Sequence, residues 1–228
     1  MRNGVEMQNS QFFVYIVESP NPGDFFDDRS EGRLIAEALT LAGIPAELRI
    51  VIDDENFLKA LHVGFFSAIK KHDKARPILH ISAHGNEEGF SLSNGSRYPW
   101  KLFGASLTKL NRAMKGNLLL CMSCCKGYSV SDLAKWVDSN DQPFAAVVGS
   151  DGEPTWTETL LGFQVFYHQL TCDKTLQDAC EAMKFATGHF DWRANTPKGI
   201  KADEIRIMTM ILEAVWSLDD IKNPPSAS

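Results

Sequence analysis

The sequence of 228 residues has no excess of basic residues and no long apolar run. With 23 Lys and Arg against 29 Asp and Glu, the formal charge is −6, so general binding to nucleic acid or to an anionic membrane is not expected. All apolar runs fall well short of the roughly 20 residues that a membrane-spanning helix needs. The first residues, MRNGVEMQNSQ, lack the apolar stretch and cleavage site of a secretory signal. We therefore expect a cytoplasmic protein.

Cysteine is scarce, and the five that are present form an odd set. A secreted disulfide scaffold uses an even set in a shorter chain, so reduced thiols are expected. The hydrophobic share of 44% and the charged share of 23% are those of an ordinary globular protein. No repeat or long linker divides the chain. The sequence predicts a single domain over residues 1–228, with a polar tail at about 222–228.

Strand-like and helix-like segments alternate along the chain. QFFVYIVES, at 11–19, is a near-continuous apolar run of the kind found in strands buried on both faces. Five strands interleaved with helices predict an α/β fold with a central, mostly parallel sheet covered on both faces. The other strands are expected at 46–53, 77–83, 117–123 and 144–150, and the helices at 33–43, 57–72, 100–114, 129–139, 156–170, 174–187 and 201–218.

The last predicted helix, EIRIMTMILEAVWSLDD, carries apolar residues on nearly every side. Packing over the sheet is the simpler interpretation of this pattern. Docking to another subunit or to a regulatory protein is the alternative.

Reactive side chains follow two of the predicted strands, where ligands gather in open parallel sheets. His84 and Gly85 follow the third strand, and Cys124 and Cys125 follow the fourth. A cysteine nucleophile needs a base or a positive environment, which His84 and the start of the helix at 129–139 would supply. The backbone N–H groups of Gly85 and Cys124 could bind the oxyanion of an acyl-transfer reaction.

Two other functions use the same residue types. Cys121 and Cys124 form a C-x-x-C pair at a strand-to-helix junction, as in thiol redox proteins. Against a redox function, strand alternation points Cys121 away from Cys124. A zinc site would need a second ligand pair, which is missing at finger-like spacing. We therefore expect no metal and no cofactor.

Two segments carry a resemblance to a known group of enzymes. PILHISAHGNEEGFSLSNG and LLLCMSCCKG resemble the histidine and cysteine segments of caspase-like and CHAT-type cysteine peptidases, whose clan includes metacaspases, separases and clostripain-like enzymes. FAAVVGSDGEPTWTETLLGFQVFYHQL is similar to the strand, loop and helix that follow in CHAT proteins. The resemblance implies a caspase-like three-layer sandwich with five or more strands.

The resemblance also implies a cysteine endopeptidase that cleaves a protein or peptide substrate. Cys124 would attack the scissile carbonyl, His84 would transfer protons, and the N–H groups of Gly85 and Cys124 would hold the oxyanion. The C-x-x-G spacing of CHAT proteins selects Cys124, whereas the caspase C-x-G spacing selects Cys125. Counting along the strand favours Cys124, and Cys125 is the alternative nucleophile. No third, orienting carboxylate is assigned.

Substrate specificity is predicted from the positions of charges. In caspases one arginine after the first strand and another after the fifth grip a substrate aspartate, and Arg29 occupies the first place. The second place has no arginine and offers Asp151 and Glu153, which favours a basic residue before the cut because a buried charge needs its opposite. Alternatively, Asp151 only forms a turn with Gly152.

Control of the activity is expected to come from a partner. Between Gly127 and Phe144 the chain has no room for the cleavable linker that activates caspases. We therefore expect a regulatory protein to control it. The non-enzymatic alternative is a caspase-like scaffold that has lost activity and binds partners.

Overall fold

A computed structural model describes residues 12–135 and 137–222. The N-terminal segment MRNGVEMQNSQ lies outside the described residues, and so does the polar tail after Lys222. Within the described residues, no helix combines the length and apolar character needed to span a bilayer.

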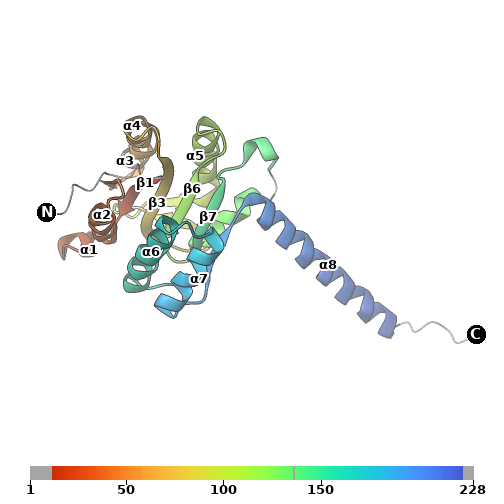
Figure 1. The fold of residues 1–228 in the computed structure, drawn as a ribbon. Coiled ribbons are helices and arrows are strands. Elements are labelled where there is room, and N and C mark those ends of the chain that lie inside the picture. The colour runs from red at the N-terminus through yellow and green to blue at the C-terminus, as the bar shows by residue number, and fades with distance from the viewer. Residues whose placement is uncertain (1–11, 136, 223–228) are drawn as a thin grey trace, which may run out of the picture.

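A twisted sheet forms the centre of the molecule (Figure 1). Its strand order is β2-β1-β3-β6-β7-β8, and only β8 runs antiparallel to its neighbour. The strands are β1 (Phe12–Ser19), β2 (Ala46–Ile50), β3 (Arg76–Gly85), β6 (Leu119–Ser123), β7 (Ala146–Ser150) and β8 (Trp192–Asn195). A hairpin of β4 (Gly89–Ser91) and β5 (Arg97–Pro99) extends from the end of β3. The predicted mostly parallel sheet is therefore confirmed, while β8 was not predicted.

Helices cover both faces of this sheet (Figure 1). One face packs on α3 (Asp54–Lys59), α4 (Phe65–Lys71) and α5 (Trp100–Ala113) and is called the α5 face. The other packs on α2 (Glu31–Leu41), α6 (Trp156–Thr171) and α7 (Leu176–Thr187) and is called the α6 face. The short helix α1 (Pro22–Phe26) precedes α2. This three-layer arrangement agrees with the predicted α/β sandwich.

Strand alternation assigns each residue of β3 and β6 to one face, because successive side chains point to opposite sides. Leu79, Ile81 and Ala83 of β3 join the apolar cluster of the α5 face. His80 instead contacts Tyr167 and Phe163 of α6. The even positions of β3 thus face α6, and the same parity continues to His84 at the strand end.

Two predicted helices differ from the structure in type. The segment predicted at 129–139 forms a 3-10 helix, η2 (Gly127–Ala134), and a second short one, η3 (Ser139–Asp141). Residues 57–72 form α3 and α4 joined by a π-helical turn, η1 (Ala60–Gly64). The α-helix expected to begin near the cysteines is therefore absent at 127–134, and its dipole cannot be used to argue for a thiolate there.

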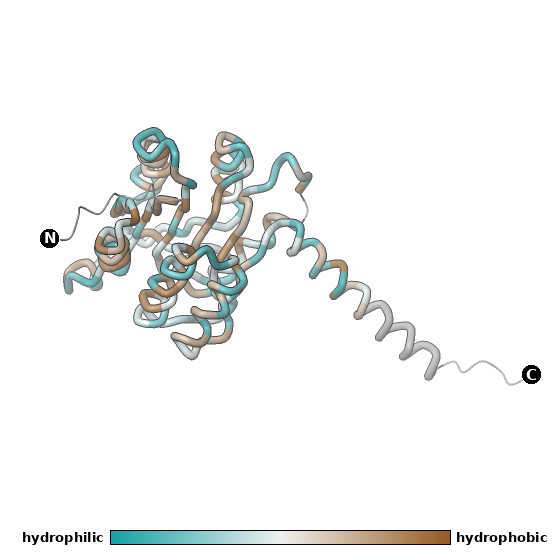
Figure 2. The backbone as a smooth tube through the Cα atoms, in the orientation of Figure 1, coloured by the Kyte–Doolittle hydropathy of each residue, from teal (hydrophilic) through white to brown (hydrophobic). Residues whose placement is uncertain are grey.

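The last helix, α8 (Pro197–Lys222), extends away from the rest of the molecule (Figure 1; Figure 2). Its N-terminal part is anchored by buried Ile200 and by an ion pair between Lys135 and Glu204. After Glu204, the side chains of Ile205 and Met210 are exposed. The prediction that this helix packs over the sheet is wrong, because other helices already cover both faces.

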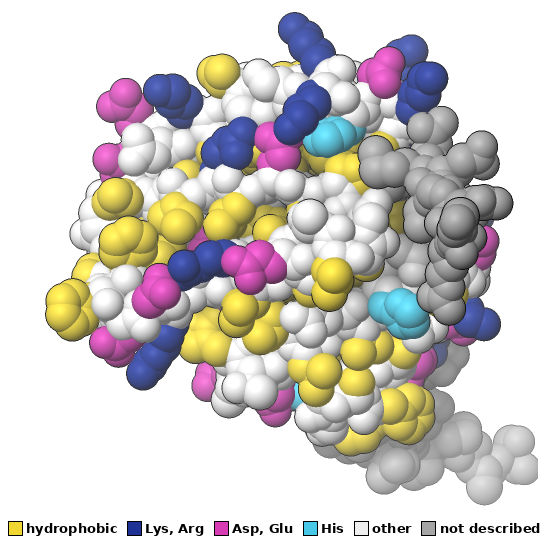
Figure 3. Space-filling view, turned by 60° about the vertical axis from the view of Figure 1, so that its left-hand side comes forward, with side chains coloured by type: hydrophobic (Ala, Val, Ile, Leu, Met, Phe, Trp, Pro, Cys, Tyr) yellow, Lys and Arg dark blue, Asp and Glu magenta, His cyan; other side chains and the backbone are white. Residues whose placement is uncertain are grey.

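The side of the molecule that carries α1 and α2 exposes several large apolar side chains between charged ones (Figure 3). Phe25, Phe26, Leu34 and Leu41 are among them. Apolar side chains interrupted by charges are normal on the surface of a soluble domain.

Candidate active site

His84 lies at the end of β3 with its side chain 47% exposed. Its Nε2 is 3.0 Å from Asn21 Nδ2 and 3.4 Å from Asp24 Oδ2. The ring also meets Trp156 edge to face, with 5.3 Å between ring centroids. The imidazole is thus held from two sides, and its Nε2 accepts from the Asn21 amide in one tautomer and donates to Asp24 in the other.

Asn21 and Asp24 are themselves fixed by the start of α1. The Asn21 Oδ1 accepts from the Asp24 backbone N–H at 2.8 Å, and Asn21 Nδ2 donates to Asp24 Oδ2 at 2.5 Å. Asp24 is nearly buried, at 9% exposure. Sequence reasoning assigned no carboxylate to His84. The available signal was Asn-Pro-Gly-Asp after the first strand, an N-cap pattern that places Asp24 at that edge of the sheet.

Arg29, predicted to grip a substrate carboxylate, lies beside this pair. Its guanidinium is 3.6 Å from Asp24 Oδ1 and 3.4 Å from Asp27 Oδ2, and its side chain is 69% exposed. The two carboxylates therefore already balance its charge. Recognition of an acidic substrate residue by Arg29 would require breaking these ion pairs.

The two cysteines after β6 occupy different environments. Cys124 is 3% exposed and belongs to the apolar cluster of the α5 face. Burial raises the pKa of its thiol far above the ordinary value. Cys125 is only half-buried, and burial and the nearby Glu153 carboxylate raise the pKa of its thiol, while Lys126 lowers it. Of the two sulfurs, that of Cys125 is more accessible to a substrate.

The register between β3 and β6 extends to the residue before these cysteines. Ser82 pairs with Ser123, and both hydroxyls donate to the Glu31 carboxylate on the α6 face. The paired register ends there, because β6 ends at Ser123 and both cysteines lie in the turn that follows. Strand alternation therefore does not assign their side chains to a face. Burial distinguishes them, since Cys124 is buried with Ala83 in the α5 cluster and Cys125 is the more exposed of the two.

Gly85 packs against the backbone that carries both cysteines. A β-carbon at this position would lie 2.5 Å from the Cys125 carbonyl oxygen and 3.0 Å from Cys124 Sγ. Only glycine allows β3 and the turn after β6 to approach this closely. The predicted oxyanion donors, Gly85 and the turn at Cys124, therefore lie side by side.

The loop after β7 reaches the same edge of the sheet. The Lys126 N–H donates to the Gly152 carbonyl oxygen at 2.8 Å, and Lys126 itself adopts a left-handed conformation with φ 54°. Asp151 is 3.3 Å from Arg193 of β8, so its charge has a partner. Glu153 is exposed and raises the pKa of the Cys125 thiol. Of the two predicted acidic residues, Glu153 is the one with an electrostatic effect on a cysteine.

Cys121 lies on the opposite face of the sheet from Cys124. It belongs to the cluster of the α6 face, where burial raises the pKa of its thiol to about 12. A disulfide between the two would have to cross the sheet, so this geometry disfavours the thiol redox function. Within residues 12–135 and 137–222, no cluster of His, Cys, Asp and Glu side chains has the arrangement of a metal site.

Comparison with known proteins finds similarity to solved structures. No protein-family model and no curated protein matches the sequence. A secreted C11 cysteine protease from Bacteroides thetaiotaomicron, solved with an irreversible peptide inhibitor, is 9% identical with a TM-score of 0.50, over 84% of this chain and 67% of that chain. The complex of RgpB pro- and mature domains from Porphyromonas gingivalis is 14% identical with a TM-score of 0.48, over 85% of this chain. The chain spans 49% of that RgpB chain. At these identities the similarity concerns the fold, which the chain shares with the C11 cysteine protease.

Proposed function

We propose that the chain is a cysteine endopeptidase of the caspase-like clan, with Cys125 as nucleophile and His84 as its proton-transfer partner. The observation that supports the proposal is the close approach of Gly85, the residue after His84, to the turn after β6, where Cys125 is the more exposed of the two cysteines. The shared fold of a C11 cysteine protease supports the same class of enzyme. Whether the chain is of the CHAT type stays a prediction from the sequence.

The proposed reaction uses only side chains and backbone of this site. The Cys125 sulfur attacks the scissile carbonyl carbon while the thiol proton passes to His84. The backbone N–H groups of Gly85 and of the Cys124–Cys125 segment stabilise the oxyanion. The C–N bond then breaks as the imidazolium protonates the leaving amine, and water hydrolyses the resulting thioester. This last step regenerates the Cys125 thiol.

Asp24 would act as a positioning residue in this reaction. An Nε2–H of His84 that donates to Asp24 leaves Nδ1 unprotonated, which is the form that can accept the thiol proton. The nearby carboxylate also stabilises the imidazolium that then forms. Asn21 holds Asp24 in place through the helix cap. Asp24 would therefore be the third, orienting carboxylate, which was not assigned from the sequence.

A preference for cleavage after a basic residue is the finer part of the proposal. Asp151 is a weaker candidate for recognising this residue than expected, because Arg193 already pairs with it. Glu153 remains exposed close to the cysteine turn. A protein or peptide is the expected substrate. The cytoplasmic location and the control by a regulatory protein stay predictions from the sequence.

Peptide cleavage tests the proposed function. The wild-type chain is incubated with a library of fluorogenic peptides that varies the residue before the cut, beside the Cys125→Ala and His84→Ala variants. Each variant should lose about a thousandfold or more in kcat/KM while keeping the circular dichroism spectrum of the wild type. The inactive-scaffold alternative gains support if the folded wild type cleaves no peptide and reacts with no thiol-directed peptide electrophile.

A further inference from the structure

Strand β2 forms one edge of the central sheet, at the opposite end of the strand order from β8. Among the described residues it pairs only with β1. The Val14 N–H donates to the Pro45 carbonyl oxygen at 3.0 Å, and a parallel ladder uses every second residue of a strand. The backbone N–H and C=O groups of Ala46, Leu48 and Ile50 therefore point away from β1, toward the outside of the sheet.

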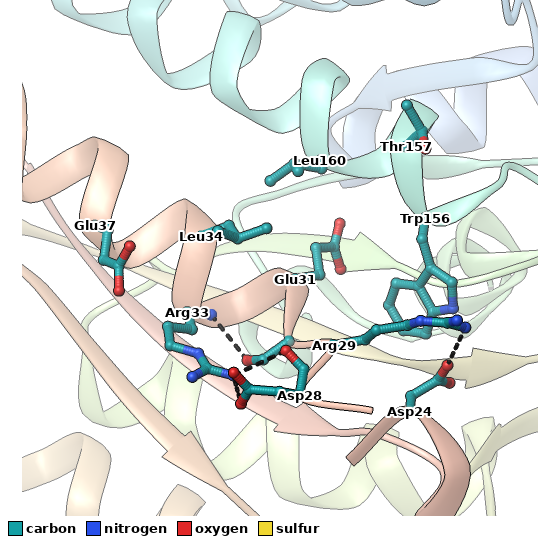
Figure 4. Close-up of a pocket in the computed structure, with 11 residues that line it drawn as sticks. Asp24, Asp28, Arg29, Glu31, Arg33, Leu34, Glu37, Trp156, Thr157 and Leu160 are labelled. Carbon is teal, nitrogen blue, oxygen red and sulfur yellow. Dashed lines mark hydrogen bonds and ion pairs between the residues drawn. The ribbon is translucent and has the colours of Figure 1, made fainter. Parts of the chain in front are cut away.

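Apolar surface lies along this edge on the α6 face. A groove of about 520 Å³ runs between α2 and β2, and Leu41 and Leu48 line it. Leu41 is 92% exposed, and Ile50 at the end of β2 is exposed as well. Arg33 also lines the groove, but its charge is already balanced by Asp28 at 2.7 Å (Figure 4). An open strand edge beside exposed apolar side chains is a surface at which chains pair.

Two opposite charges flank Leu48 on the other face of β2. Arg49 Nη2 donates to Glu47 Oε2 at 2.9 Å, and Arg49 Nη1 donates to the outward Leu48 carbonyl oxygen at 2.8 Å. The Glu47 carboxylate also pairs with Lys71 of α4 at 3.0 Å, which assigns this pair to the α5 face. The edge thus presents an acidic side chain one residue before Leu48 and a basic side chain one residue after it.

These charges select one way for two copies of β2 to pair. In an antiparallel pair across a two-fold axis at Leu48, the two Leu48 residues lie opposite each other, and Ala46 lies opposite Ile50 of the second copy. These are the residues whose backbone groups point outward, so each opposed pair exchanges two hydrogen bonds. Glu47 then lies directly opposite Arg49 of the second copy. An axis one residue earlier would oppose Glu47 to Glu47, and an axis one residue later Arg49 to Arg49, and both arrangements are unfavourable.

We propose that two copies of the chain associate through their β2 edges, antiparallel and across a two-fold axis at Leu48, so that their sheets join into one. The Arg49 guanidinium leaves the Leu48 carbonyl oxygen and pairs with Glu47 of the second copy. The freed carbonyl oxygen accepts from the Leu48 N–H across the axis, and Leu41 with the groove beside it becomes covered. A second copy is the partner that this edge fits, because its charge pattern is complementary to itself. The inference goes beyond the proposed function, since this interface uses neither His84 nor the cysteines.

Sedimentation equilibrium and amide exchange test the association with the wild-type chain. At about 200 µM the chain should sediment with twice its monomer mass, and on dilution it should dissociate. In the dimer the amides of Leu48 and Ile50 should exchange with deuterium at least about tenfold more slowly than in the dilute chain. The amides of Glu47 and Arg49 point toward β1 in both states, so their exchange should change little and is the internal control.

Charge variants test the alignment of the two strands. Arg49→Glu places a carboxylate opposite Glu47 on both sides of the axis, so the dissociation constant of the dimer should rise at least about tenfold. Arg49→Lys keeps the charge and should stay within about threefold of the wild type. The double variant Glu47→Arg with Arg49→Glu exchanges the two charges and should recover the dimer that Arg49→Glu loses. Circular dichroism checks that each variant is folded.

The outcomes separate this interface from any other. A wild-type chain that stays monomeric up to about 1 mM would overturn the proposal. A dimer that Arg49→Glu leaves as stable as the wild type would also overturn it, and so would Leu48 protection that is equal in monomer and dimer. Concentration-dependent protection of Leu48 and Ile50 that is lost in Arg49→Glu supports it. If the double variant does not fold, this concentration dependence in the wild type decides the matter.

Discussion

The two faces of strands β3 and β6 differ sharply at the carboxyl end of the sheet. On the α5 face, Ala83, Met122 and Cys124 continue an apolar core. On the α6 face, Ser82 and Ser123 share the buried Glu31 carboxylate. His84 lies two residues after Ser82 on β3, so its side chain points to the same α6 face. One face of the same two strands is therefore built for packing, and the other carries polar groups whose burial has a cost.

The two adjacent cysteines after β6 also differ, although they look alike in the sequence. Both lie in the turn beyond the last residue of β6, so strand alternation does not assign their faces, and burial is what distinguishes them. Cys124 has the burial of a core residue, and Cys125 has the exposure that a nucleophile needs.

The largest expected effect separates the two cysteines by activity. Cys125→Ala should reduce kcat/KM for peptide cleavage by about a thousandfold or more, because the nucleophile is lost. Cys124→Ala should stay within about tenfold of the wild type, because its sulfur is buried in the apolar cluster of the α5 face. Steady-state kinetics on the best peptide substrate measures both. The reverse order of losses would make Cys124 the nucleophile.

The next effect concerns the buried carboxylate of the α6 face. The folded state raises the Glu31 pKa from the ordinary 4.5 to about 7, so between these values it holds a proton that the unfolded chain has released. The free energy of unfolding should therefore fall as the pH rises through this window. Glu31→Gln removes this penalty and should be more stable than the wild type by about 3 kcal/mol above pH 8, since a tenfold change in proton affinity corresponds to about 1.4 kcal/mol.

The difference between the two unfolding curves isolates this contribution. Burial lowers the pKa of His80 to about 3, so its contribution is present above its ordinary 6.5 and is lost as the pH falls toward 3. In the wild type the contributions of His80 and Glu31 to the free energy of unfolding change in opposite directions between about pH 4.5 and 6.5. The His80 contribution is also present in Glu31→Gln, so it cancels in the difference between the two proteins. Urea unfolding from about pH 4 to 9 gives both curves. A constant difference across that range would contradict the assigned proton.

A smaller effect is expected at the group that orients the histidine. Asp24→Ala should lower kcat by about tenfold with little change in KM, because the carboxylate contacts the imidazole that transfers protons. Asp24→Asn retains a polar group but cannot stabilise the imidazolium, so its pH profile should also change shape. If Asp24 is purely structural, both variants should lose stability while the pH profile stays that of the wild type.

The smallest effect is structural. Cys124→Ala should lower the free energy of unfolding by about 1 kcal/mol, because it removes a buried sulfur from the α5 cluster. Cys125→Ala, at a half-buried position, should change it by less than about 0.5 kcal/mol. Denaturant unfolding of both variants at one pH measures the difference. Equal losses would remove the distinction between the two sites.

Most of the sheet could be predicted from the sequence. Continuous apolar runs such as QFFVYIVES identify buried parallel strands because both faces of these strands are covered. The antiparallel strand β8 was missed because Trp192–Asn195 is short and has no apolar run. For α8, apolar residues on every side predicted packing, but the pattern does not record that other helices already occupy both faces.

The sequence predicts the location of the candidate site better than it predicts which residues form it. The strand ends at His84 and Cys124–Cys125 are visible in the sequence because each follows a strong apolar run. The choice between the cysteines depends on their burial in the turn after β6, which spacing along the sequence does not give. Asp24 and Glu31 belong to helix starts that reach the site only through packing.

The most direct test of the account is to locate the thiol that reacts with a substrate-like electrophile. The wild-type chain is treated with a peptidyl chloromethyl ketone that ends in arginine, digested, and analysed by mass spectrometry. We expect a single thioether on Cys125, no adduct on Cys124, and strongly reduced labelling in His84→Ala. An adduct on Cys124 with Cys125 unmodified would contradict it.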